Sequence, residues 1–372
     1  MAARELETVL PGDHSGAGMV ARVRTSRGMD IYALGVPQSW DSQTGPTWCY
    51  LCEADTLTLV DTGKYGSLPH LEKALGAIGY RPQDIGRIII THGHADHDGN
   101  TYPLQQTSGA ELWCHEVYAS TLGIDPYVTP KDIGQPELSP MRDSPWEWED
   151  AHKTYHQDRI KLRISRALTD GESVGPFTFL YTPGHAMDEL CTLTDGVMFS
   201  GDHILPDITP HPSCCSYFDH FRSTLPLTYR KENRYFGLRT YLESVRKVGL
   251  VDHDFLVLPA HRLFNKGRWW LEGKERTGQI LDHHLRRLGR IARLADAPDS
   301  LLGLTRRLFR PSLLEGWGFF SGYTELLSHV ELLTETGDVE YVDTDKVRWR
   351  GSTNYSDFIH RLAVSSDHSL PY

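Results

Sequence analysis

The 372-residue sequence lacks the features that would place a chain in a membrane or outside the cell. It has no apolar run near 18 residues, so we expect no membrane span. The first residues, "MAARELETVLPGDHSG", contain no long apolar core and no small-residue cleavage site, so we expect no secretory signal. Together these absences predict a protein of the cytoplasm with no membrane partner.

Basic residues are also fewer than acidic residues in this chain. The formal net charge is −11, which argues against nucleic acid or an anionic membrane surface as the main partner. Apolar residues make up 39% of the chain and charged residues 23%, which are the proportions of an ordinary globular protein. The length is sufficient for two domains, and neither an internal repeat nor a low-complexity tract is present.

The few cysteines do not form the spaced framework of a small disulfide-rich domain, so we expect reduced thiols. They are Cys49, Cys52, Cys114, Cys191, Cys214 and Cys215. The pair in "CYLC" has the spacing of a zinc half-site. Because residues three apart on a strand point to opposite faces, and this stretch is predicted as a strand, we expect two structural thiols instead.

Strand and helix signals alternate from about residue 29. The stretches "TLTLVDTG" and "DIGRIIITHG" are typical of buried strands, and "LPHLEKALGAIGY" between them has the apolar spacing of a helix. Such alternation predicts an α/β layer fold. Residues 119–165 interrupt the pattern with five prolines, and we expect an irregular insertion there, either a lid over the site or a surface excursion.

The last hundred residues have a different character. A long amphipathic helix is predicted over 276–294, and it is followed by two further helices and a hairpin. We therefore expect a first domain over residues 1–270, which contains the α/β layers, and a small winged-helix-like module over 271–372. The third helix of the module carries Glu325, Glu331 and Glu335 but no lysine or arginine, so we expect it to pack against the protein and not against nucleic acid.

The segment "THGHADHDGN" concentrates histidine and aspartate directly after a buried strand. Imidazole and carboxylate are the natural ligands of zinc and similar metals. His92 and His94 alternate along an extended segment and can reach one ion, while Asp96 and His97 follow at the next turn and can reach a second. We expect Gly93 to allow the backbone to bend between the ligands.

Further candidates stand at the ends of other predicted strands. Asp61 ends "LVD", His185 follows "YTPG", Asp202 lies in "SGDH" and His261 ends "VLPAH". In an α/β fold such strand ends meet at one rim of the sheet, where binding sites usually lie. The sequence therefore predicts that all these side chains converge on one site.

The motif His-x-His-x-Asp-His and the four other positions resemble the metallo-β-lactamase superfamily over roughly residues 29–265. The resemblance implies a four-layer αββα sandwich and two zinc ions, with manganese or iron as alternatives. It assigns His92, His94 and His185 to one ion, Asp96, His97 and His261 to the other, and Asp202 to both. Asp96 and Asp61 are implied as catalytic residues, the first as ligand and orienter of the bridging hydroxide, the second as orienter of a ligand histidine.

Within the superfamily the chain looks most like the glyoxalase II-like group with a C-terminal winged-helix-like module. The resemblance implies hydrolysis of a thioester or other acyl ester of a small molecule. The alternatives are a single-strand-specific endoribonuclease, a lactonase and a non-enzymatic winged-helix regulator. The stretch "HAMDEL" at 185–190 departs from the usual version of this turn, which leaves the substrate open.

Residues for substrate binding are only weakly indicated by the sequence. Arg230, Lys231 and Arg234 precede a predicted helix and could meet an anionic substrate tail, although a solvated basic patch is the simpler interpretation. The aromatic residues Phe218 and Phe236 fit either a pocket wall or core packing. A homo-oligomer is compatible with the sequence.

Overall fold

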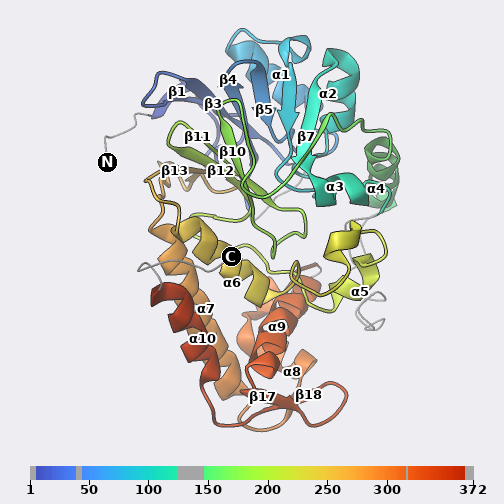
Figure 1. The fold of residues 1–372 in the computed structure, drawn as a ribbon, viewed down its shortest axis with the longest axis vertical. Helices are drawn as coiled ribbons and strands as arrows, with labels where there is room; N and C mark the ends of the chain where they lie inside the picture. Colours follow the sequence, from blue (N-terminus) through green and yellow to red (C-terminus); the bar gives the residue numbers. More distant parts are fainter. Residues whose placement is uncertain (1–5, 39–43, 125–145, 316, 365–372) are drawn as a thin grey trace.

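The computed structural model describes residues 6–38, 44–124, 146–315 and 317–364. Two β-sheets form a sandwich in the upper part of the molecule, and the C-terminal helices lie below it (Figure 1). Within the described part of the chain, no helix is long and apolar enough to cross a membrane.

The first sheet contains eight strands that lie side by side in chain order. They are β1 (Leu6–Leu10), β2 (Val20–Arg24), β3 (Asp30–Val36), β4 (Thr47–Glu53), β5 (Leu57–Val60), β6 (Arg87–Ile89), β7 (Glu111–His115) and β8 (Arg166–Leu168). Strands β1 to β5 are antiparallel, and β5 to β8 are parallel. The sequence analysis began the alternation near residue 29 and so missed β1 and β2.

The second sheet has the order β13-β12-β11-β10-β9. Its strands are β9 (Ser173–Val174), β10 (Phe177–Tyr181), β11 (Leu190–Thr194), β12 (Val197–Gly201) and β13 (Leu256–Pro259). Only β12 and β13 are parallel neighbours. Strand β11 is antiparallel to both β10 and β12, so β10 points the same way as β12 and β13.

The sheets pack face to face, with Tyr50 and Phe199 among the side chains buried between them. The outer face of the first sheet is covered by α1 (Leu68–Ala77) and α2 (Thr101–Ser108). Helix α6 (Leu238–Gly249) covers the outer face of the second sheet. This arrangement confirms the α/β sandwich with helices outside both sheets. Cys49 and Cys52 face opposite sides of β4, as predicted, and all six cysteines are free thiols.

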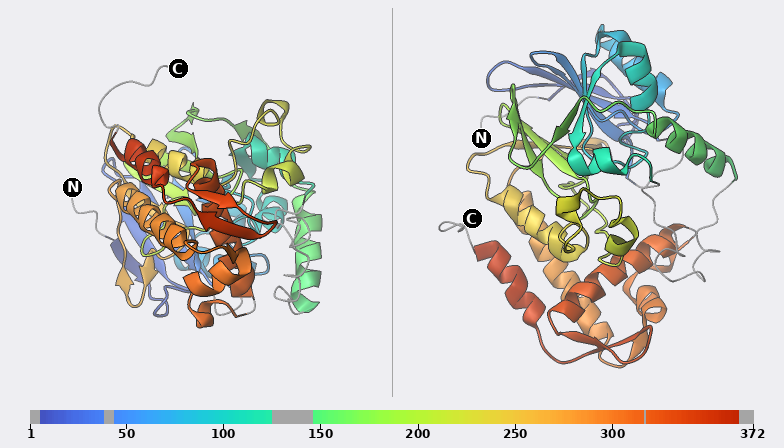
Figure 2. Two further views of the ribbon diagram at one scale, coloured as in Figure 1. Left: turned by 90° about the horizontal axis from the view of Figure 1, so that it is seen from below. Right: turned by 45° about the vertical axis from the view of Figure 1, so that its right-hand side comes forward.

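The predicted insertion contains more regular structure than its prolines suggested. Helix α3 (Glu116–Thr121) follows β7 directly, and α4 (Trp146–Arg159) lies along the flank of the sandwich (Figure 2, right). Residues 125–145, where the prolines are concentrated, lie outside the described residues. The insertion expected over 119–165 therefore includes a helix before β8.

The C-terminal part contains α7 (Arg276–Leu294), α8 (Leu301–Leu308), α9 (Trp317–Glu335) and α10 (Asn354–Val364). A small sheet has the order β16 (Asp299–Ser300), β18 (Lys346–Trp349), β17 (Val339–Tyr341). Helix α10 and β16 were not predicted. The buried side chains of α7, α8 and α9 form one continuous hydrophobic cluster with α6 and the outer face of the second sheet. The predicted boundary at residues 270/271 therefore does not coincide with a break in the core.

The remaining elements are short. They are α5 (Tyr217–Phe221), the hairpin of β14 (Phe264–Asn265) and β15 (Arg268–Trp269), and the 3-10 turns η1 (Pro82–Asp84), η3 (Leu227–Tyr229) and η4 (Pro311–Leu313).

Candidate metal centre

The predicted ligands lie together at the carboxyl ends of the strands, as the strand directions predict. Asp61 follows β5, His92 follows β6, and Asp202 and His261 follow the parallel strands β12 and β13. His185 lies beyond β10, which points in the same direction as β12. The carboxyl ends of strands from both sheets thus meet at one rim of the sandwich.

Three overlapping groups of side chains have ligand atoms close enough to hold a metal ion. They are His92, His94 and His185; His92, His97 and Asp202; and Asp96, His97 and His261. All seven predicted ligands are included.

The distances place Asp202 between the two outer groups. Its Oδ2 lies 3.5 Å from Nε2 of His185, and its Oδ1 lies 3.5 Å from Nε2 of His261. On the other side of the site, Oδ2 of Asp96 is 3.3 Å from Nε2 of His261 and accepts a hydrogen bond from Gln38. The two oxygens of Asp202 therefore face different histidines.

Three of the candidate ligand histidines are held by hydrogen bonds at Nδ1, the ring nitrogen that faces away from the site. Nδ1 of His97 is 2.9 Å from Asp61, Nδ1 of His261 is 3.0 Å from the Pro46 carbonyl, and Nδ1 of His185 is 2.7 Å from the His211 carbonyl. A carbonyl or carboxylate at Nδ1 assigns the proton to that nitrogen and leaves Nε2 free as a ligand. His94 is the exception, because its Nδ1 faces Nε2 of His92 at 2.9 Å.

Several buried atoms at the centre have no hydrogen-bond partner among the described residues. They include Nε2 of His97, Nε2 of His185 and Oδ1 of Asp202. Buried polar atoms are rarely left without a partner in a folded protein. Their convergence with the imidazole and carboxylate donor set fits a divalent metal ion well.

The charges of these side chains shift one another's proton affinities. Burial lowers the pKa of His94 to about 3. Burial alone would lower the pKa of His97 as well, but the carboxylates of Asp96 and Asp202 raise it well above its ordinary value. In turn, burial would raise the pKa of Asp202, but the neighbouring His261 and His97 hold it below its ordinary value. The site thus keeps its carboxylates ionised and ready to bind a cation.

Asp61 lies behind the candidate ligands, and its carboxylate is only 2% exposed. It accepts hydrogen bonds from the backbone N–H and the hydroxyl of Thr91, in addition to its contact with His97. Its φ of +56° is a left-handed conformation that aspartate tolerates better than most residues. This geometry fits the predicted orienting role, since Asp61 belongs to none of the three ligand groups.

Replacing Asp61 by asparagine is expected to weaken metal binding at the group containing His97 by about 10–100-fold, because the ring loses its charged acceptor. The loss should be smaller than that caused by His97→Ala, which removes a ligand. Competition titration against a chelating dye measures both. An Asp61→Asn affinity equal to that of the wild type would show that Asp61 does not orient His97.

Two carboxylates in "HAMDEL" also support the site, although the sequence analysis treated this stretch only as a departure from the family pattern. Glu189 is fully buried, lies 3.3 Å from Nδ1 of His92 and accepts a hydrogen bond from the backbone N–H of Asp202. Burial and the charge of Asp202 raise the pKa of Glu189 well above its ordinary value. Gly201 has a φ of +51°, and a Cβ there would collide with Glu189 and Thr91. A glycine before Asp202 is therefore required.

The second carboxylate, Asp188, accepts a hydrogen bond from the backbone N–H of Gly93. Burial, partly offset by Arg159, raises the pKa of Asp188 to about 6. A Cβ on Gly93 would collide with the guanidinium of Arg159 and approach Asp188. The φ of Gly93 is outside the left-handed region, so close packing, and not the expected bend, explains this glycine.

A buried network below the ligand loop connects it to helix α4. Asp98 accepts hydrogen bonds from Arg159 at 3.0 Å, from Tyr155 at 2.6 Å and from Tyr118 at 2.8 Å. Arg159 also donates to the carbonyl of Thr121. Thus α4 contributes to the support of the ligand loop, which the sequence analysis did not foresee.

The residues that the sequence weakly indicated for substrate binding contact other parts of the protein and not the candidate ligands. Arg230 donates to the Leu225 carbonyl, Arg234 pairs with Glu232, and Lys231 is exposed. Their predicted role stays a prediction. Phe218 and Phe236 are buried in a small cluster with Tyr181 and with Met187 of the "HAMDEL" turn, where they pack as core residues.

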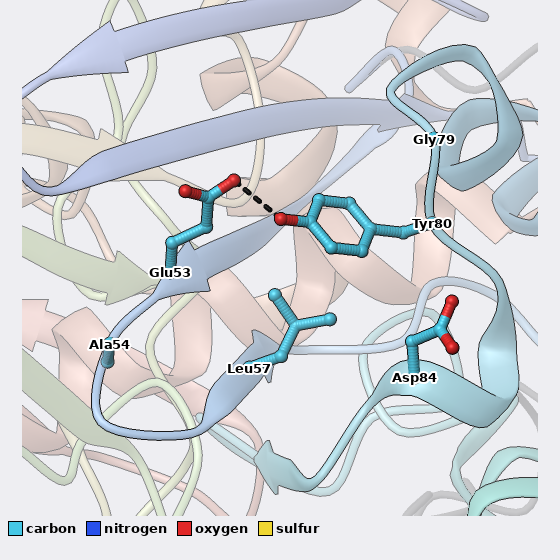
Figure 3. A pocket seen from close by; sticks show the side chains of 6 residues that line it. All are labelled: Glu53, Ala54, Leu57, Gly79, Tyr80 and Asp84. Carbon is cyan, nitrogen blue, oxygen red and sulfur yellow. Dashed lines mark hydrogen bonds between the residues drawn. The ribbon is translucent and has the colours of Figure 1, made fainter.

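One surface cavity lies far from this rim. It is lined by Glu53, Leu57 and Tyr80, and the hydroxyl of Tyr80 donates to Glu53 at 2.6 Å (Figure 3). Leu57 begins β5, whereas Asp61 follows its end. The cavity is therefore at the opposite end of the sheet from the candidate ligands.

The chain belongs to the metallo-beta-lactamase superfamily, whose family model matches residues 42–261 and so spans all the candidate ligands. The fold and the His/Asp site together define a metal-dependent hydrolase of this superfamily, with divalent metal binding implied. In sequence the chain is 26% identical over 250 residues to the probable metallo-hydrolase YqjP of Bacillus subtilis (strain 168), covering 62% of this chain and 71% of the relative.

Two solved structures share the fold over nearly their whole length. A metallo-beta-lactamase family protein from Thermus thermophilus has a TM-score of 0.61 and 21% identity, covering 86% of this chain and 98% of its own. A beta-lactamase domain protein from Burkholderia ambifaria has a TM-score of 0.62 and 22% identity, covering 92% of this chain and 97% of its own. At these identities the likeness concerns the fold alone.

Proposed function

We propose that the protein is a dinuclear metal-dependent hydrolase that cleaves a thioester or other acyl ester of a small molecule. The observation that carries the proposal is the position of Asp202, whose two oxygens each lie 3.5 Å from a histidine of a different ligand group. His92, His94 and His185 would hold one ion and Asp96, His97 and His261 the other, with Asp202 shared. Zinc is the first choice for this donor set, with manganese or iron as alternatives.

When bound, two such ions would supply a nucleophilic hydroxide at neutral pH and polarise the oxygen of the scissile carbonyl. The protein side chains would orient the reactants. Asp96 is held by Gln38 at 3.1 Å and lies among the ligand histidines, so it is placed to accept a proton from the attacking group. Asp61 and Glu189 would keep His97 and His92 in their ligand orientations.

A cavity near the C-terminal helices has a size that fits a small-molecule substrate. It has a volume of about 370 Å³ and lies between the loop after β12 and helix α7, with Asp207, Arg276 and Arg286 in its lining. Asp207 is 3.7 Å from the guanidinium of Arg262, the residue next to His261, and none of the candidate ligands lines the cavity. Its volume is within the range common for small-molecule pockets.

The C-terminal elements support a winged-helix-like module of the glyoxalase II-like group. Their order is helix, strand, helix, helix and hairpin, with β16 paired to the second strand of the hairpin.

The three glutamates of α9 all have protein partners. Glu325 pairs with Arg287, Glu335 pairs with Arg239, and Glu331 accepts from the backbone N–H groups of Cys215 and Ser216. This use of α9 favours a packing role over nucleic-acid binding. The free thiols favour a reducing compartment such as the cytoplasm.

The proposal predicts that fully active protein contains two metal ions per chain. Removing them with a chelator should abolish hydrolysis of a panel of acyl-thioesters and oxygen esters, and adding back zinc, manganese or iron should restore it. Elemental analysis and turnover measure the two effects. Full activity with one ion or fewer would contradict the dinuclear site, and cleavage of single-stranded RNA or lactones alone would replace the proposed substrate.

A further inference from the structure

The carbonyl that holds His185 comes from another part of the chain than the groups that hold His97 and His261. His97 is held by Asp61 and His261 by the Pro46 carbonyl, both of which belong to the first half of the sandwich. His185 is held at 2.7 Å by the carbonyl of His211, which lies in the loop between β12 and α5. The orientation of His185 therefore depends on where that loop is fixed.

The side chain of His211 fixes the loop to helix α9 of the C-terminal module. Its Nε2 lies 2.8 Å from the hydroxyl of Thr324 and 3.1 Å from the Ser321 carbonyl. A carbonyl accepts only, so Nε2 of His211 carries the proton and donates. His211 is therefore bonded to α9 through its ring and to the ligand His185 through its carbonyl.

The residues that follow strengthen both connections. Cys214 contacts the carbonyl of Thr324 through its thiol, and Glu331 of α9 accepts from the backbone N–H of Cys215 at 2.7 Å. On the side that faces the metal centre, Ser213 donates hydrogen bonds from its backbone N–H and its hydroxyl to the carbonyl of Gly184, the residue directly before His185. The segment 211–216 is therefore clamped between α9 and the turn that carries the ligand.

We propose that His211 is a positioning residue through which the C-terminal module sets the orientation of His185, so that the module is part of the metal centre. The inference rests on the proposed metal-binding role of His185. It concerns the group of His92, His94 and His185, because His97 and His261 are held by Asp61 and Pro46 and not by the loop that is bonded to α9. Loosening His211 should therefore weaken one metal site selectively.

The test is a stepwise cobalt(II) titration of the metal-free full-length protein, in which absorption spectra resolve the two sites. His185→Ala identifies the site that contains this ligand. His211→Ala is expected to weaken cobalt binding at that same site by about 10-fold or more, and to change the second site by less than about twofold. His211→Gln retains an N–H donor at a similar reach, so it should restore most of the affinity.

A matched control separates positioning from loss of general stability. Arg239→Met removes the ion pair of α6 with Glu335, which also joins α9 to the sandwich but does not involve the loop of His211. It should leave both cobalt affinities unchanged. Thr324→Val provides a milder variant that keeps the side-chain shape, and it should weaken the same site as His211→Ala.

Three results would overturn the inference: unchanged affinity in both His211→Ala and Thr324→Val, equal weakening of the two sites, or the same weakening in Arg239→Met. Failure of the proposed function is distinguishable, because a wild-type protein that binds two cobalt ions but hydrolyses no ester would still show the selective effect.

Discussion

Replacing Asp202 by alanine is expected to lower turnover by more than about 100-fold, beyond the range typical of residues that only support a ligand. The reason is that its two oxygens face His185 and His261, which belong to different ligand groups. Loss of this side chain should weaken both proposed metal sites, whereas His261→Ala should release mainly one ion. Elemental analysis together with turnover on an acyl-ester substrate measures the difference.

Two further variants make the comparison interpretable. Asp202→Asn keeps the shape of the side chain but removes its charge, so it should also lose metal if the carboxylate is shared. Asp219→Ala removes an exposed carboxylate on α5 and should behave as the wild type. Metal content and turnover of Asp202→Ala that match or exceed those of His261→Ala would argue against a shared ligand.

Replacing Arg159 by methionine is expected to destabilise the protein by about 3–5 kcal/mol, because it leaves a buried carboxylate without its cation. The side chains of Asp98 and Arg159 are 0% and 1% exposed, so water cannot take over the lost contact. Burial raises the pKa of Asp98 and the guanidinium opposes that rise, which means that the arginine keeps the carboxylate ionised. Urea unfolding of the metal-free protein measures the change in the free energy of unfolding.

The matched control is Arg166→Met, which breaks an Arg–Glu pair whose side chains are 43% and 23% exposed. Exposed pairs contribute at most about 1 kcal/mol, so this variant should differ little from the wild type. The double variant Asp98→Asn with Arg159→Met should recover part of the loss, because the unpaired buried charge is gone. A loss below about 1 kcal/mol in Arg159→Met would show that the pair is not an important support of the ligand loop.

The candidate ligands could be predicted because they stand in the segments that follow strands with a strong apolar signal. "RIII" before His92 and "VLP" before His261 identify buried strands, and the direction of parallel strands then brings their ends together. The grouping of seven ligand side chains thus follows from local sequence and one rule of sheet geometry.

The supporting residues could not be found in that way. Arg159 reaches Asp98 across 61 positions of sequence, from a helix whose low apolar content is typical of a solvent-exposed surface. Asp188 and Glu189 are charged residues at the start of an apolar strand, and only the folded structure shows what they contact. Residues that act through a three-dimensional contact leave no periodic pattern in the sequence.

The same distinction applies to the fold. Helix α7 has a strong amphipathic pattern and was predicted over the residues that it occupies. Strands β1 and β2 are short, and β1 is largely exposed, so their apolar signal was weak. Helix α10 follows the predicted hairpin and was missed, although Tyr355, Phe358 and Ile359 bury one of its faces.

The hydrophobic cluster shared by the second sheet, α6 and the C-terminal helices also determines how the chain unfolds. The family model ends at residue 261, but this cluster continues through Ile280, Leu288 and Leu326. Elements that share one core lose their packing together, so we expect the second sheet, α6 and the C-terminal helices to unfold as one cooperative unit. A chain shortened after residue 261 would therefore expose the apolar side chains of α6 that now pack in this cluster.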